Sequence, residues 1–188
     1  MIDEKNLESY ITSSKYFHFS AIALAILNER ETLISLLQKL HGKVTISFDT
    51  NFRKGLWEDI GVLRSFIESA SSFVDILFVS KSDDENIFGV RSADEAIRYY
   101  QSLGYKLIIY KQGGEDVIVW DGEYLLYVPT FKNINVVDAT ADGDALNAGF
   151  ISSYLRGENV QRCVTIGNGI AASVLGHKGA LVEELRLS

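Results

Sequence analysis

The sequence is poor in several residue types, and each shortage excludes a class of protein. It has one cysteine, Cys163, in 188 residues, so it has no internal disulfide, and it lacks the clustered cysteine and histidine spacing of a zinc site. Its single proline, Pro129, excludes a proline-rich linker. No stretch approaches the roughly 20 apolar residues of a membrane span. We therefore expect no membrane partner and a cytoplasmic location.

Basic residues are also too few and too dispersed for a nucleic-acid partner. Against 25 acidic residues stand 18 basic ones, which gives a net charge of -7, and no Lys/Arg block is present. The three histidines, His18, His41 and His177, are far apart in the sequence, which favours structural or surface roles over a metal or nucleophile system. No Gly-x-Gly-x-x-Gly follows the first predicted strand, and this argues against a dehydrogenase of the dinucleotide-binding type.

What the chain does have is an alternation of two hydrophobic patterns, in a composition that is 47% hydrophobic. Short runs rich in Val, Ile, Phe and Tyr alternate with longer stretches whose apolar residues have helical spacing. The runs that predict buried strands are 16–19, 44–48, 74–79 and 107–110. The pattern predicts one α/β domain over residues 1–188, with a doubly wound, mostly parallel sheet flanked by helices.

Helix starts and buried stripes can be predicted in the same way. Asn28 with Glu31, and Ser92 with Glu95, have the spacing of a capping box. The predicted buried residues of the three helices are Leu33, Leu36, Leu37 and Leu40; Leu63, Phe66, Ile67 and Ala70; and Ala96, Ile97, Tyr100 and Leu103. Cys163 is expected to be a small buried residue on a helix.

The pattern changes after residue 110. Residues 117–120 and 124–128, separated by Asp121-Gly122, indicate an antiparallel hairpin. Two helices are then expected at 145–155 and 160–175, and their small residues would let them pack closely. An antiparallel edge therefore follows the parallel part of the fold.

The segment between the hairpin and these helices has the pattern strand, loop, helix. Val136-Val137 predicts a short strand, 138–143 a loop of small and acidic residues, and Asp144 the first helical position. The start of a helix offers unpaired N–H groups and the positive end of its dipole, which suit a phosphate. A carboxylate there can accept a proton from an attacking hydroxyl. The alternative, which the local sequence alone favours, is that Asp144 only caps the helix.

This segment, Asp138-Ala139-Thr140-Ala141-Asp142-Gly143-Asp144, resembles the Asp-Thr-Thr-Gly-Ala-Gly-Asp signature of ribokinase-like (PfkB-type) carbohydrate kinases. The resemblance implies a ribokinase-like fold, ATP and Mg²⁺ as cofactors, and a sugar or sugar acid as substrate. It further implies that Asp144 is the catalytic base and that the backbone of Ala141, Asp142 and Gly143 forms the anion hole.

Two of the departures from the signature matter for the site. Ala141 replaces the first glycine, which at a positive φ costs on the order of 1 to 2 kcal/mol. Asp142 replaces an alanine, and a carboxylate about 4 Å from a phosphoryl charge is repelled by around 4 kcal/mol at an effective dielectric near 20. Catalysis is expected to suffer unless Asp142 points to solvent or holds a cation.

Other segments resemble the 2-keto-3-deoxygluconate kinases within this family. Asp49-Thr50-Asn51-Phe52-Arg53 is similar to their Asp-x-Asn-x-Arg stretch, which implies that Asn51 and Arg53 bind substrate or phosphate. A guanidinium is suited to either anion because its fork matches two oxygens. Without the resemblance, Arg53 would be interpreted as a solvated surface residue.

Three weaker motifs follow in the family's order. Glu85 matches the glutamate of an Asn-x-x-Glu motif that implies a magnesium contact through water, although Ser82 replaces the asparagine; an acidic first helical turn is the alternative. Lys111 and Gly113 match a turn near the nucleotide, or are simply a turn between strands. Asn168 and Ala172 match a late helix that lines the adenine pocket, or a helix packing interface.

The resemblance covers the C-terminal part of the family's fold. The glycine-rich N-terminal part and the β lid over the sugar have no counterpart in this sequence, so we expect little or no sugar phosphorylation by this chain alone. Three interpretations compete: part of a kinase, a non-catalytic nucleotide-binding or regulatory remnant, or a subunit completed by a chain carrying the N-terminal half. Self-association into a homo-oligomer is a further expectation. The residues do not decide which sugar is the substrate.

Overall fold

The computed structural model describes residues 9–27, 30–132 and 134–179. The chain divides into two compact units, Met1–Tyr110 and Lys111–Ser188. The expectation of a single domain stays a prediction.

The first unit contains a sheet with the strand order β1-β2-β3-β4. The bounds are β1 Tyr16–Ser20, β2 Thr45–Asp49, β3 Ile76–Ser80 and β4 Leu107–Lys111, whose last residue opens the second unit. Strands β1 and β2 pair in parallel, with Phe19 opposite Phe48, and β2 and β3 also pair in parallel. The four strands expected from the sequence are therefore confirmed, as is their parallel pairing in these two cases.

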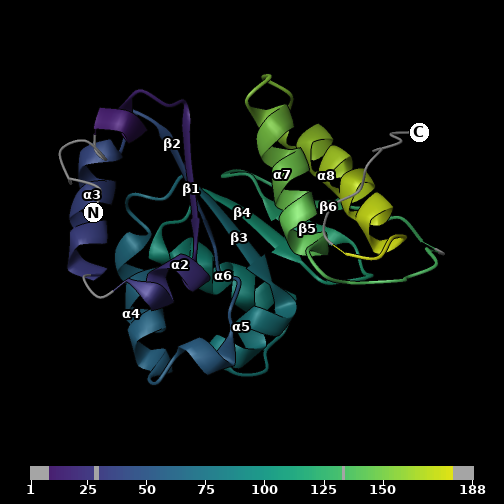
Figure 1. Cartoon of the computed structure of the whole chain (residues 1–188), viewed down its shortest axis with the longest axis horizontal. Coiled ribbons are helices and arrows are strands. Elements are labelled where there is room, and N and C mark those ends of the chain that lie inside the picture. Colours follow the sequence, from purple (N-terminus) through teal and green to yellow (C-terminus); the bar gives the residue numbers. More distant parts are fainter. Residues whose placement is uncertain (1–8, 28–29, 133, 180–188) are drawn as a thin grey trace. The chain divides into compact units, whose positions relative to one another are not determined.

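Helices connect and cover these strands. Their bounds are α2 Ala21–Ile26, α3 Arg30–Leu40, α4 Ile60–Ala70, α5 Lys81–Phe88 and α6 Ala93–Leu103, with a short 3₁₀ helix, η1, at Lys54–Leu56. Helices α3 and α4 lie next to each other (Figure 1). The sequence did not predict α2, because its six apolar residues continue directly from β1 and its N-cap, Ser20, makes no side-chain capping bond.

The predicted buried stripes are largely correct. All four stripe residues of α4 are buried, and in α3 only Leu36 is half-buried instead of buried. In α6, Leu103 is half-buried and the other three are buried. The capping box of Ser92 and Glu95 is present, whereas Asn28 lies outside the described residues.

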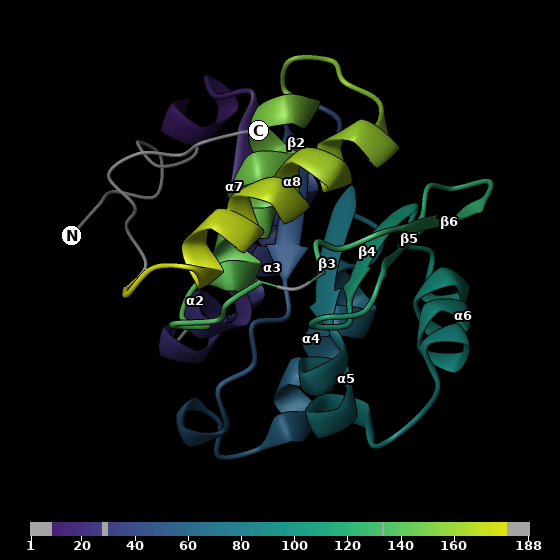
Figure 2. The ribbon, with the colours of Figure 1, turned by 90° about the vertical axis from the view of Figure 1, so that its right-hand side faces the viewer.

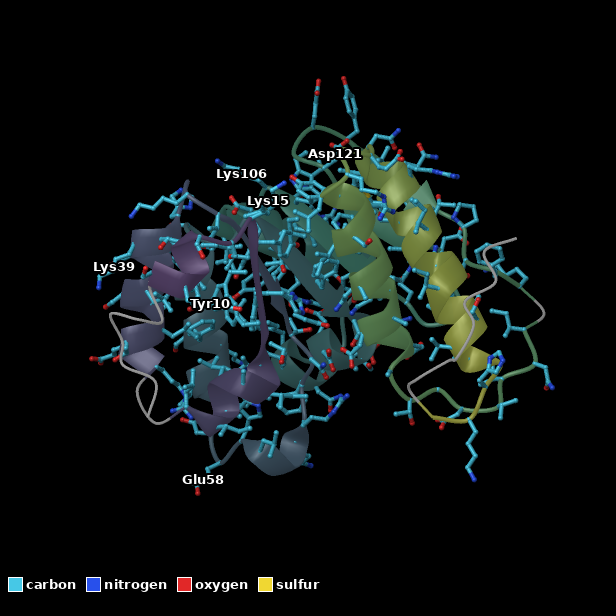
Figure 3. All side chains as sticks on the ribbon, turned by 45° about the horizontal axis from the view of Figure 1, so that its top comes forward. Tyr10, Lys15, Lys39, Glu58, Lys106 and Asp121 are labelled. Atoms are coloured by element: carbon cyan, nitrogen blue, oxygen red, sulfur yellow. The ribbon has the colours of Figure 1, made fainter. Side chains whose placement is uncertain are left out.

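Several side chains of the first unit project from its surface. Lys39 and Glu58 point away from the ribbon in Figure 3, and both are exposed. Tyr10, also labelled there, is 77% exposed. Within the described residues, no helix is long and apolar enough to cross a membrane.

The second unit combines the hairpin with two packed helices. Strands β5 (Val117–Trp120) and β6 (Leu125–Val128) pair antiparallel, as predicted, and Asp121 at their turn accepts from the N–H groups of Glu123 and Tyr124 (Figure 3). Helices α7 (Asp142–Tyr154) and α8 (Val160–Leu175) lie side by side in Figures 1 and 2.

The two helices approach closely at glycines. A Cβ on Gly149 would lie 2.8 Å from the Cα of Gly167, and a Cβ on Gly167 would lie 2.6 Å from the carbonyl oxygen of Leu146. Both distances are far shorter than carbon contacts at optimal separation. The expectation that small residues allow close packing here is confirmed. Cys163 is buried on α8, also as expected.

Val136-Val137 does not form the predicted strand. Both side chains are exposed, and the N–H groups of Val137 and Asp138 donate to the carbonyl oxygen of Leu175, at 2.8 and 3.3 Å. The backbone of this segment is therefore held by the last turn of α8 and not by a neighbouring strand. β-branched residues alone do not make a strand where no strand partner is present.

Candidate active site

The first turn of α7 is the centre of the candidate site. Helix α7 begins at Asp142, so the predicted loop ends at Ala141, and Asp144 is the third helical residue and not the first. Ala141 is the N-cap residue, with φ 64° and ψ 14°, in the left-handed region. The alternative that Asp144 caps the helix is therefore wrong. The position where the family signature has glycine does require a positive φ here.

This helix start has no side-chain cap. Asp59, Ser80, Ser92 and Asn159 cap α4, α5, α6 and α8 by accepting a backbone N–H, whereas Ala141 has only a methyl group to offer α7. Helix geometry leaves the first N–H groups without an intrahelical acceptor. An anion at this turn would meet those donors together with the positive end of the dipole.

Asp138 anchors the loop that leads into this turn. One carboxylate oxygen accepts from the Thr140 N–H at 2.8 Å, and the other accepts from the Gly179 N–H at 3.0 Å. The hydrogen bonds from Thr140, followed by the one from Gly179, lower the pKa of Asp138 below its usual value. Asp138 therefore joins the start of α7 to the segment that follows α8.

Lys111 places a buried ammonium group beside the same turn. The residue is 9% exposed, and its Nζ lies 3.5 Å from the point where a Cβ on Gly143 would stand. Nζ also donates to Oδ1 of Asn147, at 3.2 Å, on the next turn of α7. The structure therefore brings together Lys111 and Gly143, two of the residues predicted for nucleotide and phosphate binding.

The residues predicted to line an adenine pocket lie along α8. Asn168 is buried and donates to the carbonyl oxygen of Pro129 at 3.0 Å, while Ala172, one turn later, is half-buried. Phe131 contacts α8 between them, since its ring lies 3.7 Å from the Cβ position of Gly169. Gly113 lies in the exposed turn after β4, with φ 65°.

In the first unit, the predicted substrate residues follow β2. Thr50 is fully buried; its N–H donates to the carbonyl oxygen of Phe78 and its hydroxyl to the Asp83 carboxylate, both at 3.0 Å. These bonds hold the start of the Asn51 loop against β3 and α5. Asn51 has φ 20°, and its N–H donates to Asp49. Arg53 is exposed and donates to the carbonyl oxygen of Phe52 at 3.1 Å.

A buried ion pair holds α5 in place. Asp84 has no exposed surface and accepts two hydrogen bonds from Arg91, one of them at 2.9 Å, and a third from the Tyr100 hydroxyl at 2.7 Å. The Arg91 guanidinium also lies 4.6 Å from the ring centre of Tyr99. Burial raises the pKa of Tyr99 to about 12, with a further contribution from its hydrogen bond to Glu68.

The hydrogen bonds of Asp83 and Asp84 affect which carboxylate of this acidic run could bind a cation. Because Asp84 is paired with Arg91 and Asp83 accepts from Thr50, Glu85, which is half-buried, is the remaining acidic residue of this run. Within the described residues, no group of three or more potential ligands could hold a metal ion directly. A single carboxylate such as Glu85 is compatible with Mg²⁺, which commonly uses one or two carboxylates plus waters and phosphate oxygens.

Sequence reasoning missed three residues that shape these sites: Asn147, Phe131 and Thr50. Asn147 had a visible signal, because it is a polar residue four positions after Gly143 on a helix whose neighbouring positions, Leu146 and Phe150, are apolar. Such a residue on a buried stripe must find a polar partner. Phe131 and Thr50 had no comparable signal, since their partners are distant in the sequence.

Known proteins that resemble this chain match it across both units. The family model described as pfkB family carbohydrate kinase matches residues 1–184. The 2-dehydro-3-deoxygluconokinase of Haemophilus influenzae is 33% identical over 177 residues, which are 91% of this chain and 56% of that protein. This enzyme name is a synonym of 2-keto-3-deoxygluconate kinase. The chain thus spans little more than half the length of this curated relative.

Solved structures show the same fold. The aminoimidazole riboside kinase of Salmonella enterica, complexed with its riboside and an ATP analog, superposes with a TM-score of 0.79 at 23% identity, over 88% of this chain and 57% of that one. A ribokinase II of Escherichia coli in complex with ATP and Mg²⁺ gives a TM-score of 0.77 at 20% identity, over 92% and 56%. The expected ribokinase-like α/β fold and the expected resemblance to 2-keto-3-deoxygluconate kinases are both confirmed.

Proposed function

The chain belongs to the pfkB family of carbohydrate kinases, and on that premise we propose that it carries the nucleotide-binding and phosphoryl-transfer part of an ATP-dependent sugar or sugar-acid kinase. The observation that carries the proposal is the start of α7. There the family signature leads through a left-handed Ala141 into a helix whose first turn has no side-chain cap and contains Asp144.

Phosphate binding is the first function of this turn. The N–H groups at Ala141, Asp142 and Gly143 form the anion hole, and the dipole of the 13-residue helix adds positive potential. The Lys111 ammonium beside Gly143 adds a full charge. Donors fixed in this way require no reorganisation as negative charge develops on the transferred group.

Asp144 is the proposed base. Its carboxylate is exposed in the first turn, one residue beyond the anion hole, where a bound sugar hydroxyl could reach it. As the hydroxyl oxygen bonds to the γ-phosphorus, its proton passes to Asp144, and the bond from the γ-phosphorus to the β,γ-bridging oxygen breaks, leaving ADP. Mg²⁺, when bound, offsets the charge of the phosphates, and Glu85 would hold its waters.

The proposed substrate is a 2-keto-3-deoxygluconate-like sugar acid. The support is the Haemophilus relative, together with Asn51 and Arg53 after β2. Arg53 is exposed, so its guanidinium is accessible to a carboxylate or phosphate. The chain spans 56% of that relative, and we propose that the 188-residue chain alone binds nucleotide better than it phosphorylates sugar.

One observation favours a second function, a nucleotide-binding module without catalysis. Asp142 is the first residue of α7 and is half-buried, so its carboxylate is not fully screened by water. A negative charge at the anion hole opposes both nucleotide binding and transfer. A subunit completed by a chain with the N-terminal half remains the third interpretation, and it predicts that such a chain restores turnover.

The deciding experiment combines two measurements on the whole chain. Calorimetric titration with ATP and Mg²⁺ tests nucleotide binding, and a coupled assay with 2-keto-3-deoxygluconate tests transfer, alone and with the N-terminal half of the Haemophilus relative added. We expect ATP binding, weak turnover, and a loss of about 10²- to 10⁴-fold in any turnover with Asp144→Asn. Absence of ATP binding would refute the nucleotide proposal. Unchanged turnover in the Asp144→Asn protein would remove Asp144 as the base.

A further inference from the structure

Arg30 lies against the ring of Trp57 in the first unit. Its Cζ atom is 5.6 Å from the centre of the Trp57 ring, which is a cation–π contact. Arg30 is the first residue of α3, and Trp57 directly follows η1, which contacts α2. The pair therefore joins the start of α3 to the loop that carries Asn51 and Arg53.

Among the described residues, Arg30 has no hydrogen-bond acceptor. Its Nε and the indole Nε1 of Trp57 are both buried, and neither atom has a partner in this part of the chain. Both atoms are donors, so they cannot satisfy each other. Burial of a donor without an acceptor is unfavourable, and the dipole disfavours a cation at the start of a helix. Apart from the contact with Trp57, the stability of the fold therefore gives no reason for an arginine here.

The contact with Trp57 orients the guanidinium of Arg30. Because the residue is half-buried and Nε is covered, an anion can approach only the outer edge, which carries Nη1 and Nη2. These two groups form a fork that matches the two oxygens of a carboxylate. Within the described ranges, no carboxylate lies at ion-pair distance from Arg30, so a bound carboxylate would not have to displace one.

The exposed Arg53 lies at the other end of the same turn. The bonds of η1 run from the Leu56 N–H to the carbonyl oxygen of Arg53 at 2.9 Å, and from the Trp57 N–H to the carbonyl oxygen of Lys54 at 3.3 Å. Arg53, which is predicted to bind substrate, is thus one 3₁₀ turn from the indole that holds Arg30. The turn couples the position of Arg30 to that of the predicted substrate residue.

We propose that Arg30 is a further substrate-binding residue, which binds the carboxylate of the sugar acid through Nη1 and Nη2, and that Trp57 is the positioning residue that orients it. The inference rests on the proposed function, since it takes a sugar acid as the substrate. It assigns to Arg30, in addition to Arg53, the preference for a sugar acid over a neutral sugar.

Trp57 can report directly on this site. Trp57 and Trp120 are the two tryptophans of the sequence, so Trp57 alone determines the tryptophan fluorescence of a Trp120→Phe protein. In that protein we expect 2-keto-3-deoxygluconate, titrated at constant ionic strength, to change the emission saturably. Its methyl ester, which lacks the charge, should bind about tenfold more weakly or worse, the worth of a hydrogen bond to a charged group. An unchanged emission, or equal affinities for acid and ester, would overturn the assignment.

Arg30→Met in the same protein isolates the role of Arg30. It removes the charge and keeps the apolar stem, so the affinity for the acid should fall about tenfold or more, while that for the ester stays within about twofold. Arg98→Met is the matched control, since it makes the same change at an exposed arginine of α6 and should leave both affinities unchanged. Unaltered binding of the acid by the Arg30→Met protein would remove Arg30 from the site.

Urea denaturation separates binding from structural support. A purely structural Arg30 would give a lower midpoint on replacement and equal losses for acid and ester, and that result would contradict the proposal. We expect the midpoint of Arg30→Met to stay the same or rise, because a buried donor without an acceptor is removed. If the Arg30→Met protein does not fold, Arg30→Lys decides the question. It keeps the charge but lacks the planar fork, and it should weaken binding of the acid about threefold or more; unchanged affinity would again exclude Arg30.

The outcomes keep this inference apart from the proposed function. If the unmodified chain binds ATP, and Arg30→Met binds the acid as well as the unmodified chain does, only the role of Arg30 is overturned. If the chain binds no ATP but binds the acid through Arg30, the nucleotide proposal fails and the carboxylate site stands. A change of Trp57 emission by inorganic phosphate at lower concentrations than by the acid would show a phosphate site, and the assignment to a carboxylate would be wrong.

Discussion

Gly149 on α7 and Gly167 on α8 are so close that a Cβ on the first would lie 2.8 Å from the Cα of the second. The contact partner is backbone, which cannot rotate away as a flexible side chain could. The helices can therefore keep their present separation only if position 149 lacks a side chain.

Gly149→Ala is expected to destabilise the protein by about 1 to 3 kcal/mol, the usual cost of overpacking. The loss would appear in spite of a gain in helix propensity of roughly 1 kcal/mol for alanine over glycine. Urea denaturation measures it. Gly114→Ala is the control, since a Cβ there meets nothing within 4 Å. Equal stability of the Gly149→Ala protein and the unmodified chain would contradict the close packing.

Ala141→Gly is expected to stabilise the chain by about 1 kcal/mol, because φ is 64° at this position and a Cβ is unfavourable in the left-handed region. The same replacement at Ala148, an exposed position inside α7, should instead destabilise by roughly 1 kcal/mol through helix propensity. Thermal unfolding of the two variants gives the comparison. Changes of the same sign would show that Ala141 is not strained.

Asp142→Ala is expected to tighten ATP binding by about fivefold, since a charge about 4 Å away contributes about 1 kcal/mol even with water-like screening. Removal of the exposed Glu158 side chain makes the same change in net charge away from the helix start and should leave the affinity unchanged. Titration calorimetry at two salt concentrations checks both. A weaker ATP complex after Asp142→Ala would indicate that this carboxylate holds a cation instead.

The pKa of Asp138 is lowered in the folded chain by its hydrogen bonds from Thr140 and Gly179. The folded state therefore binds this proton less readily than the unfolded state, so the stabilisation is present above the unfolded pKa of about 3.9 and is lost as pH falls through the lower folded pKa. Urea midpoints from pH 6 down to pH 2.5 should thus fall less steeply for Asp138→Asn than for the unmodified chain. Parallel curves would argue against these bonds.

Much of the first unit could be predicted from local patterns. The α4 stripe and the capping box at Ser92 depend on spacings within one element, and both are present. The predicted strand at Val136-Val137 was wrong because the N–H groups of Val137 and Asp138 donate to Leu175, almost forty residues away. Local propensity carries no information about such a distant partner.

In the candidate site, too, some features could be predicted from the sequence and others required the tertiary structure. The resemblance placed Ala141 at the glycine position of the signature, and the positive φ agrees with it. The local sequence pattern placed the helix start at Asp144 instead of Asp142, since small and acidic residues are equally typical of a loop and of a first helical turn. The side-chain bonds of Lys111 to Asn147 and of Thr50 to Asp83 required the tertiary structure, because each joins residues more than thirty positions apart.

The bonds that join the two ends of the α7–α8 pair have a consequence for motion. Val137 and Asp138 donate to Leu175, and Gly179 donates back to Asp138, so the entrance to α7 and the exit from α8 are clamped together. Neither helix can slide along the other without breaking this clamp. We therefore expect amide hydrogen exchange in both helices to slow together when a ligand occupies the start of α7, as in a single cooperative opening unit.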